Sequence, residues 1–247
     1  MIAGLPMYDR PALRGAHDRL WQAFRARYAQ APARLEQEGD VWALWQSPDL
    51  LLAQTCGLPF RARLQGQVTL VGSPDHWLKD CPPGYYRSHL IRRAGDSRDL
   101  TGLARGVLAV NDGLSQSGWA APSAHLAEQG LHCARAVHSG AHAASVAMVA
   151  QGAADWAAID AVTWAMLARD TPDLTARVVV FDSTMPTPAL PYITAPGRDG
   201  PALRAAFAGA IAALDAADRD ALCLHGLVDL GAQAYTELPL PEAPPFV

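Results

Sequence analysis

The sequence has almost no lysine, and its basic residues are not gathered in one place. Lys79 is the only lysine, the arginines are scattered, and the net charge is −4 with an isoelectric point near 6.0. A protein that binds nucleic acid needs a basic stripe or patch to neutralise phosphates. We therefore expect no nucleic-acid partner.

The chain also lacks the marks of export and of membrane insertion. Its first residues, MIAGLPMYD, have no basic region, apolar region or cleavage site of a signal peptide. As written, the chain is expected in the cytoplasm, and in the periplasm if an export signal is missing from this sequence. The most apolar stretch, residues 136–168, is interrupted by histidine, glycine and aspartate, so no membrane insertion is expected.

Cysteine is scarce, and the spacing of the cysteines fits no metal-binding motif. The four cysteines form no C-x-x-C motif and have no paired histidines beside them, which argues against a zinc site. We predict no metal and no other cofactor. Cys56 and Cys81 each lie beside Gly or Pro, and a disulfide between them stays open as an alternative to buried thiols.

Half of the 247 residues are hydrophobic and 18% are charged, as in a folded globular protein. Strand-like apolar runs alternate with stretches of helical periodicity, which indicates an α/β fold with mostly parallel sheets. The expected strands are residues 2–8, 49–54, 66–74, 88–95, 107–112, 134–140, 156–162 and 175–184. The expected helices or helical turns are residues 12–30, 41–46, 98–106, 120–130, 141–152 and 200–216.

This order divides into two lobes. Residues 105–189 form a self-contained run of strands and helices and are predicted as lobe 2. Residues 1–104 and 190–247 are predicted as a discontinuous lobe 1, because a Pro-rich stretch after residue 184 can carry the chain back. The helix at 200–216, which starts with Gly-Pro, would then pack on lobe 1. A cleft is expected between the lobes.

The stretch VNDGLSQSGW, Val110 to Trp119, is unusually polar for the start of a helix. Ser115 or Ser117 can cap the helix that follows, and the free N–H groups of a first helical turn attract anions. An ordinary cap needs only one serine. The second serine and Gln116 therefore favour an oxyanion site, and we call Ser115 to Ser117 the serine loop.

Other junctions between strand and helix also carry polar residues. His142 follows HSG in the first turn of the expected helix 141–152, where a ligand contact and a surface histidine both stay open. Asp160 ends an apolar strand, and its carboxylate must meet a ligand proton, a cation or a helix N-terminus. Tyr8 and Thr55 occupy the equivalent strand ends of lobe 1.

An enzyme remains an alternative. The serine loop runs G-x-S-x-S, close to the G-x-S-x-G of a hydrolase, and Ser115, His142 and Asp160 could form a Ser-His-Asp set. Their order along the chain differs from the order expected of that fold, in which the acid precedes the histidine. A synthase or an effector sensor of similar architecture is also open, although the chain carries no DNA-binding or signalling module.

The order of these motifs resembles the phosphate, phosphite and phosphonate substrate-binding proteins of ABC transporters. The likeness runs from LPMYD through DLLLAQTCG, YRSHLIRR, AVNDGLSQSGW and HSGAHAASV to PALPYITAPG. It implies a type 2 periplasmic-binding fold, in which two α/β lobes joined by two crossover strands close over a ligand without catalysis. The implied partners are a small oxyanion and an ABC transporter membrane subunit, and we expect a monomer.

Carried over residue by residue, the resemblance implies that the serine loop holds phosphoryl oxygens and that the aspartate meets a protonated ligand oxygen. The sequence departs from the family at Gln116, where a smaller Ser or Thr is common, and at Trp119. Both departures predict a pocket shaped for something other than a simple phosphonate. The implied ligand contacts are Tyr8, Thr55, Ser115, Gln116, Ser117, His142 and Asp160.

Overall fold

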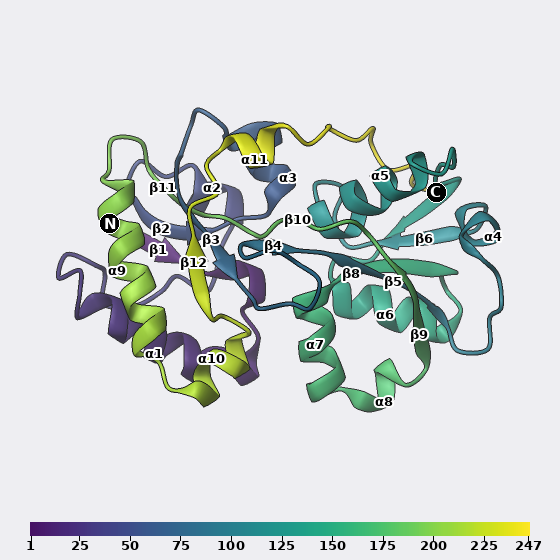
Figure 1. Cartoon of the computed structure of the whole chain (residues 1–247), viewed down its shortest axis with the longest axis horizontal. Helices are drawn as coiled ribbons and strands as arrows, with labels where there is room; N and C mark the ends of the chain where they lie inside the picture. The colour runs from purple at the N-terminus through teal and green to yellow at the C-terminus, as the bar shows by residue number, and fades with distance from the viewer. The chain divides into compact units, whose positions relative to one another are not determined.

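The computed structural model describes residues 1–247 and divides them into two units, each with its own sheet (Figure 1). Unit 1 comprises Met1–Tyr85 and Pro188–Leu238, and unit 2 comprises Tyr86–Thr187 and Pro239–Val247. The chain therefore passes between the units three times, where the resemblance implies two crossovers. The strands β4 (Tyr85–Tyr86) and β10 (Thr187–Pro188) contain the first two passages.

These boundaries differ from the predicted ones. Residues 86–104 belong to unit 2, because β5 (Ser88–Arg93) pairs with β8 and β9 within that unit's sheet. Residues 239–247 also belong to unit 2, because the segment hydrogen-bonds to the strand that contains Ala136. The sequence pattern shows neither pairing.

The sheet of unit 1 has the strand order β1-β2-β11-β3-β12. Its strands are β1 (Ile2–Gly4), β2 (Leu50–Gln54), β3 (Thr69–Asp75), β11 (Tyr192–Thr194) and β12 (Gly226–Val228). Its helices are α1 (Arg14–Arg25), α2 (Val41–Trp45), α3 (Gly57–Pro59), α9 (Gly200–Ala213), α10 (Ala216–Leu222) and α11 (Gln233–Thr236), with the helical turns η1 (Pro6–Tyr8), η2 (Pro11–Leu13) and η3 (Phe60–Leu64).

The sheet of unit 2 has the strand order β7-β6-β8-β5-β9. Besides β5, its strands are β6 (Val107–Val110), β7 (Arg135–His138), β8 (Trp156–Asp160) and β9 (Val178–Ser183). Its helices are α4 (Leu100–Ala104), α5 (Ala121–Ala127), α6 (His142–Gln151), α7 (Ala161–Asp170) and α8 (Pro172–Thr175), and the π-helical turn η4 (Gln116–Ala120) precedes α5.

The α/β class is confirmed, but both sheets are mixed instead of mostly parallel. In unit 1, β11 lies between β2 and β3 and runs antiparallel to both, and β12 runs antiparallel to β3. In unit 2, β5 runs antiparallel to β8 and β9. Alternation of strands and helices indicates parallel β-α-β units. This alternation does not predict whether β11 and β5 run parallel or antiparallel to their neighbours, because each strand enters its sheet soon after a passage between units.

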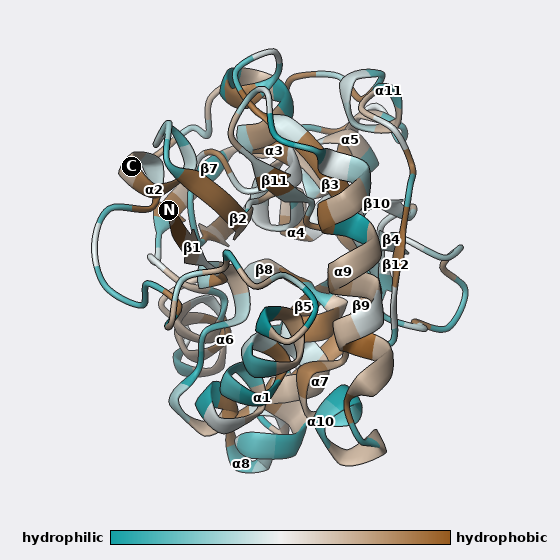
Figure 2. Cartoon of the chain, turned by 90° about the vertical axis from the view of Figure 1, so that its left-hand side faces the viewer, coloured by the Kyte–Doolittle hydropathy of each residue, from teal (hydrophilic) through white to brown (hydrophobic).

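Apolar burial explains why the elements of unit 1 form where they do. β2, with the sequence LLLAQ, is buried along its whole length and is brown in Figure 2. The helix α1 places Leu20 and Phe24 on one buried face, and the ring of Phe24 meets Phe207 of α9 edge-on at 5.7 Å. The helix at 200–216 therefore packs within unit 1, as predicted, although it ends at Ala213.

Neither cysteine pairing nor a membrane span is present. All four cysteines carry thiols, so Cys56 and Cys81 form no disulfide. None of the helices has both the length and the apolar character that crossing a membrane requires.

Candidate functional site

The predicted residues of unit 2 gather at one edge of its sheet. β6 runs parallel to both of its neighbours, β7 and β8, so the carboxyl ends of all three strands lie at the same edge. The serine loop follows β6, His142 begins the helix after β7, and Asp160 is the last residue of β8. Because β6 lies between the strands that follow it in sequence, this edge is a topological switch point, where open α/β sheets form binding crevices.

The two serines of the serine loop have different tasks. Ser115 is the N-cap of η4, since its Oγ accepts a hydrogen bond from the Gly118 amide at 2.9 Å. Ser117 is also buried, and its carbonyl accepts a hydrogen bond from the Ser88 hydroxyl at 2.9 Å. Ser88, which the sequence analysis missed, thus ties the serine loop to β5.

Ser117, His142 and Asp160 form a buried chain of contacts. The Ser117 Oγ lies 2.9 Å from His142 Nε2, and the same nitrogen lies 3.5 Å from Asp160 Oδ2. The side chains of His142 and Asp160 are only 12% and 4% exposed. Three residues that lie far apart in the sequence are therefore brought together by three adjacent strand ends.

Asp160 contacts both a backbone amide and a histidine. Its Oδ1 accepts a hydrogen bond from the Thr163 amide at 2.8 Å and caps α7, while its Oδ2 faces His142. The two interpretations of this aspartate, a helix cap and a member of the site, are therefore compatible. The cap also ends β8 at Asp160, and α7 begins at the next residue. The apolar pattern of the sequence did not predict this helix.

The surroundings of His142 favour the neutral form of its imidazole. Burial lowers the pKa of its imidazole below the ordinary value of 6.5, and the nearby Asp160 opposes this only in part. In the neutral ring, the carboxylate favours the tautomer with the proton on Nε2. Ser117 Oγ then accepts from Nε2 and keeps its own hydrogen as a donor, while His142 Nδ1 is a buried acceptor without a hydrogen-bond partner.

This arrangement lacks the geometry of a Ser-His-Asp hydrolase. In such a triad the serine and the acid contact opposite nitrogens of the histidine, so that the ring can accept the serine proton. Here both Ser117 and Asp160 face Nε2, and no group hydrogen-bonds to Nδ1. Ser115, the serine of the G-x-S-x-S pattern, acts as a helix cap.

The two departures from the family pattern differ in their surroundings. Gln116 is buried, and its Nε2 lies 3.5 Å from Thr187 Oγ1, a long hydrogen bond. Trp119 is 5% exposed and packs in the hydrophobic core of unit 2, with its indole N–H donating to the Glu242 carbonyl at 2.7 Å. The expectation that Trp119 shapes a ligand pocket is therefore not supported, because its ring fills the core.

Of the two predicted residues of unit 1, only Thr55 lies at a strand end, because the strand expected over residues 2–8 stops at Gly4. Tyr8 ends the helical turn after β1, and Thr55 follows β2 directly. Thr55 is fully buried, its amide donates to the Pro191 carbonyl at 2.9 Å, and its hydroxyl has no hydrogen-bond partner. The ring of Tyr8 meets His76 edge-on at 6.0 Å. His76 follows β3 and was missed, because a lone histidine after a strand gives no pattern.

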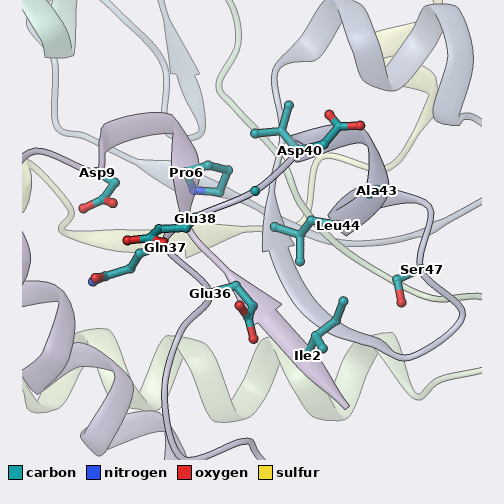
Figure 3. Close-up of a pocket in the computed structure, with 12 residues that line it drawn as sticks. Ile2, Pro6, Asp9, Glu36, Gln37, Glu38, Asp40, Ala43, Leu44 and Ser47 are labelled. Carbon is teal, nitrogen blue, oxygen red and sulfur yellow. The ribbon is translucent and has the colours of Figure 1, made fainter.

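A separate cavity of about 470 Å³ in unit 1 has acidic walls (Figure 3). Asp9, Glu36, Glu38 and Asp40 contribute carboxylates to it, and all but Asp9 are exposed. Like charges repel, so this lining disfavours an anionic ligand. No group of three or more His, Cys, Asp or Glu side chains in the chain is arranged to hold a metal ion.

The lowered pKa of His142 predicts a pH-dependent stability. Below pH 6.5 the unfolded chain protonates this histidine before the folded protein does, so stability falls as pH drops from 6.5 through the folded-state pKa. In urea unfolding of the ligand-free protein at a series of pH values, H142Q should lose stability less steeply than the wild type. His17 and His89, whose pKa values are also lowered by burial, remain in both proteins. If the free energies of unfolding of H142Q and the wild type changed equally with pH, the lowered pKa of His142 would be contradicted.

Comparison with known proteins identifies relatives of the chain. The sequence profile of a family described as "ABC transporter, phosphonate, periplasmic substrate-binding protein" matches residues 59–237. Among solved structures, PhnD1 from Prochlorococcus marinus (MIT 9301), in complex with methylphosphonate, is 17% identical with a TM-score of 0.74, over 95% of this chain and 94% of that chain. No match is found among curated proteins.

Two further structures are also similar over more than nine-tenths of the chain. XAC2383 from Xanthomonas citri, bound to ATP, is 15% identical with a TM-score of 0.72, over 96% of this chain and 94% of that chain. A binding protein component of an ABC phosphonate transporter (PA3383) from Pseudomonas aeruginosa is 12% identical with a TM-score of 0.68, over 92% and 80%. At these identities the likeness establishes the fold, which is the type 2 periplasmic-binding fold.

Proposed function

The chain belongs to the family of periplasmic substrate-binding proteins of phosphonate ABC transporters, and on this premise we propose that it binds a phosphorus oxyanion without changing it. The binding group is the set of side chains at the carboxyl edge of β6, β7 and β8. The family serves ABC transporters in the periplasm. We propose the same location and a transporter membrane subunit as the partner of this chain.

One observation carries the proposal: Ser117, His142 and Asp160 meet in a buried chain of contacts at the ends of three parallel strands. His142 Nδ1 is buried without a hydrogen-bond partner, and such a group costs free energy unless a ligand satisfies it. A ligand oxygen that carries a proton would satisfy His142 Nδ1 or Asp160.

The chemistry of the group suits an oxyanion that is partly protonated. The Ser117 hydroxyl is able to donate to a charged oxygen, and hydrogen bonds to an ionised acceptor are about twice as strong as neutral ones. Asp160 is able to accept from a P–OH group but would repel an oxyanion without a proton. The set of partners therefore favours phosphonate or phosphate over sulfate.

Thr55 provides a test of the predicted contribution of unit 1. Its buried hydroxyl has no partner, and an unsatisfied hydroxyl destabilises the folded state by about 1–3 kcal/mol. The isosteric variant T55V should therefore be at least as stable as the wild type in urea unfolding. If Thr55 contacts the ligand, the same variant should bind methylphosphonate about fivefold more weakly, the equivalent of one hydrogen bond. Unchanged affinity would remove Thr55 from the binding residues.

The proposed function is tested by a thermal-shift screen of phosphate, phosphite, methylphosphonate and sulfate. A ligand that binds only the folded protein must raise the Tm, by an amount that grows with its concentration. We expect phosphorus oxyanions to raise the Tm and sulfate to leave it unchanged. A screen in which no phosphorus oxyanion raises the Tm would argue against the proposal.

A further inference from the structure

We propose that the segment Pro239–Val247, which we call the strap, is a positioning element that holds the chain segments carrying Ser117 and His142. The strap follows the third passage of the chain between units and belongs to unit 2 (Figure 1, yellow end of the chain). The claim that the strap keeps the serine loop in place rests on contacts within unit 2. Its effect on ligand affinity rests on the proposed function as well.

The strap contacts the chain on both sides of the serine loop. On one side, the Trp119 indole N–H donates to the Glu242 carbonyl at 2.7 Å, although the Trp119 ring itself lies in the core of unit 2. On the other side, a Cβ built on Gly113 would lie 3.6 Å from Pro244 and 3.8 Å from Phe246. The strap therefore hydrogen-bonds to the chain just after the serine loop and lies close to Gly113 just before it.

The strap also contacts the strand that leads to His142. The Ala136 amide donates to the Pro245 carbonyl at 2.9 Å, and the Val247 amide donates to the Ala136 carbonyl at 3.0 Å. The ring of Phe246 meets His138, the last residue of β7, edge-on at 5.9 Å. One short segment is thus bound to both chain stretches that bring Ser117 and His142 together.

The composition of the strap suits this task. Four of its residues are prolines, each of which has its φ angle restricted by its ring, so little conformational entropy is lost when the strap is ordered. A competing account is that the strap only covers the open edge of the sheet at β7. Edge protection predicts a loss of stability alone, whereas positioning predicts greater opening of the serine loop and weaker ligand binding.

The first test compares two tryptophans of the same core cluster. W119F removes the indole donor to Glu242, whereas W156F removes a similar volume and an N–H that has no partner. Hydrogen–deuterium exchange is measured for the amides of residues 115–120 in the ligand-free protein. We expect exchange to rise about fivefold in W119F relative to W156F, the equivalent of one lost hydrogen bond. Equal exchange in the two variants would overturn the proposal.

The second test keeps the core intact and alters the strap. F246A removes the ring that meets His138, and L240A is the matched control, because Leu240 is 62% exposed and precedes the strap contacts. F246A, but not L240A, should speed exchange in residues 115–120 and raise the Kd for methylphosphonate about threefold to tenfold. This pair decides the question if W119F does not fold, and equal exchange in F246A and L240A would overturn the proposal.

The two proposals fail in different ways. If the wild type does not bind methylphosphonate or any other phosphorus oxyanion, the proposed function is wrong, and the exchange measurements still decide whether the strap positions the serine loop. If the wild type binds and F246A changes neither exchange nor Kd relative to L240A, the strap serves only as an edge cover and the positioning role is wrong.

Discussion

Replacing Ser117 or His142 with alanine is expected to weaken methylphosphonate binding at least about tenfold in calorimetry. Each change removes a hydrogen-bonding partner of a charged ligand, and such bonds contribute about 1.5–3 kcal/mol, which corresponds to a factor of ten or more. The two side chains lie 2.9 Å apart, so S117A also removes the contact that orients the imidazole. The double variant should therefore lose less than the sum of the two single losses.

Matched variants separate this effect from a general loss of structure. Ser123 donates to the Trp119 carbonyl one turn earlier in the chain, and S123A removes a hydroxyl of the same unit outside the contact chain. His132 is exposed, so H132A removes an imidazole without disturbing the core. Both controls should bind methylphosphonate like the wild type. An S117A protein with the affinity of S123A would exclude Ser117 from the binding group.

The variant D160N is expected to change which anions bind. Asparagine is as good a helix cap as aspartate, so the bond to the Thr163 amide should persist and the Tm should change little. The amide carries no charge and is able to donate, which removes the repulsion between Asp160 and an unprotonated oxygen. We expect methylphosphonate affinity at about pH 7 to fall about tenfold, and we expect sulfate to bind to D160N although not to the wild type.

The control for this prediction is another aspartate cap. Asp199 caps α9 in unit 1 by accepting a hydrogen bond from the Ala202 amide at 2.9 Å. D199N makes the same chemical change at a helix that has no predicted ligand contact, and it should keep the anion preference of the wild type. If D160N and D199N show the same preference, Asp160 does not select the protonated oxyanion.

Part of the fold was predictable because the residues carry local signals. β6 and β8 are largely apolar runs, and the parallel order of β6, β7 and β8 follows from the helices between them. The three-residue strands β11 and β12 were missed, because so short a run has no measurable periodicity. The helix α7 was missed because its start depends on the cap made by Asp160, and an apolar strand leads straight into it.

The candidate site was predictable to the extent that parallel strands bring their carboxyl ends to one edge. That rule led to the serine loop, His142 and Asp160 without any knowledge of their distances. Contacts from antiparallel or distant segments were not predictable. Ser88 reaches the Ser117 carbonyl from β5, and Glu242 reaches Trp119 from the strap. No local sequence pattern indicates either of these two hydrogen bonds.

The central claim is that Ser117, His142 and Asp160 hold the oxyanion, and a crystal structure of the protein grown with methylphosphonate tests it most directly. The account predicts phosphonate oxygens within hydrogen-bond distance, about 2.5–3.2 Å, of Ser117 Oγ and of either His142 or Asp160. A phosphonate bound elsewhere, with the contact between Ser117 and His142 unchanged, would contradict it.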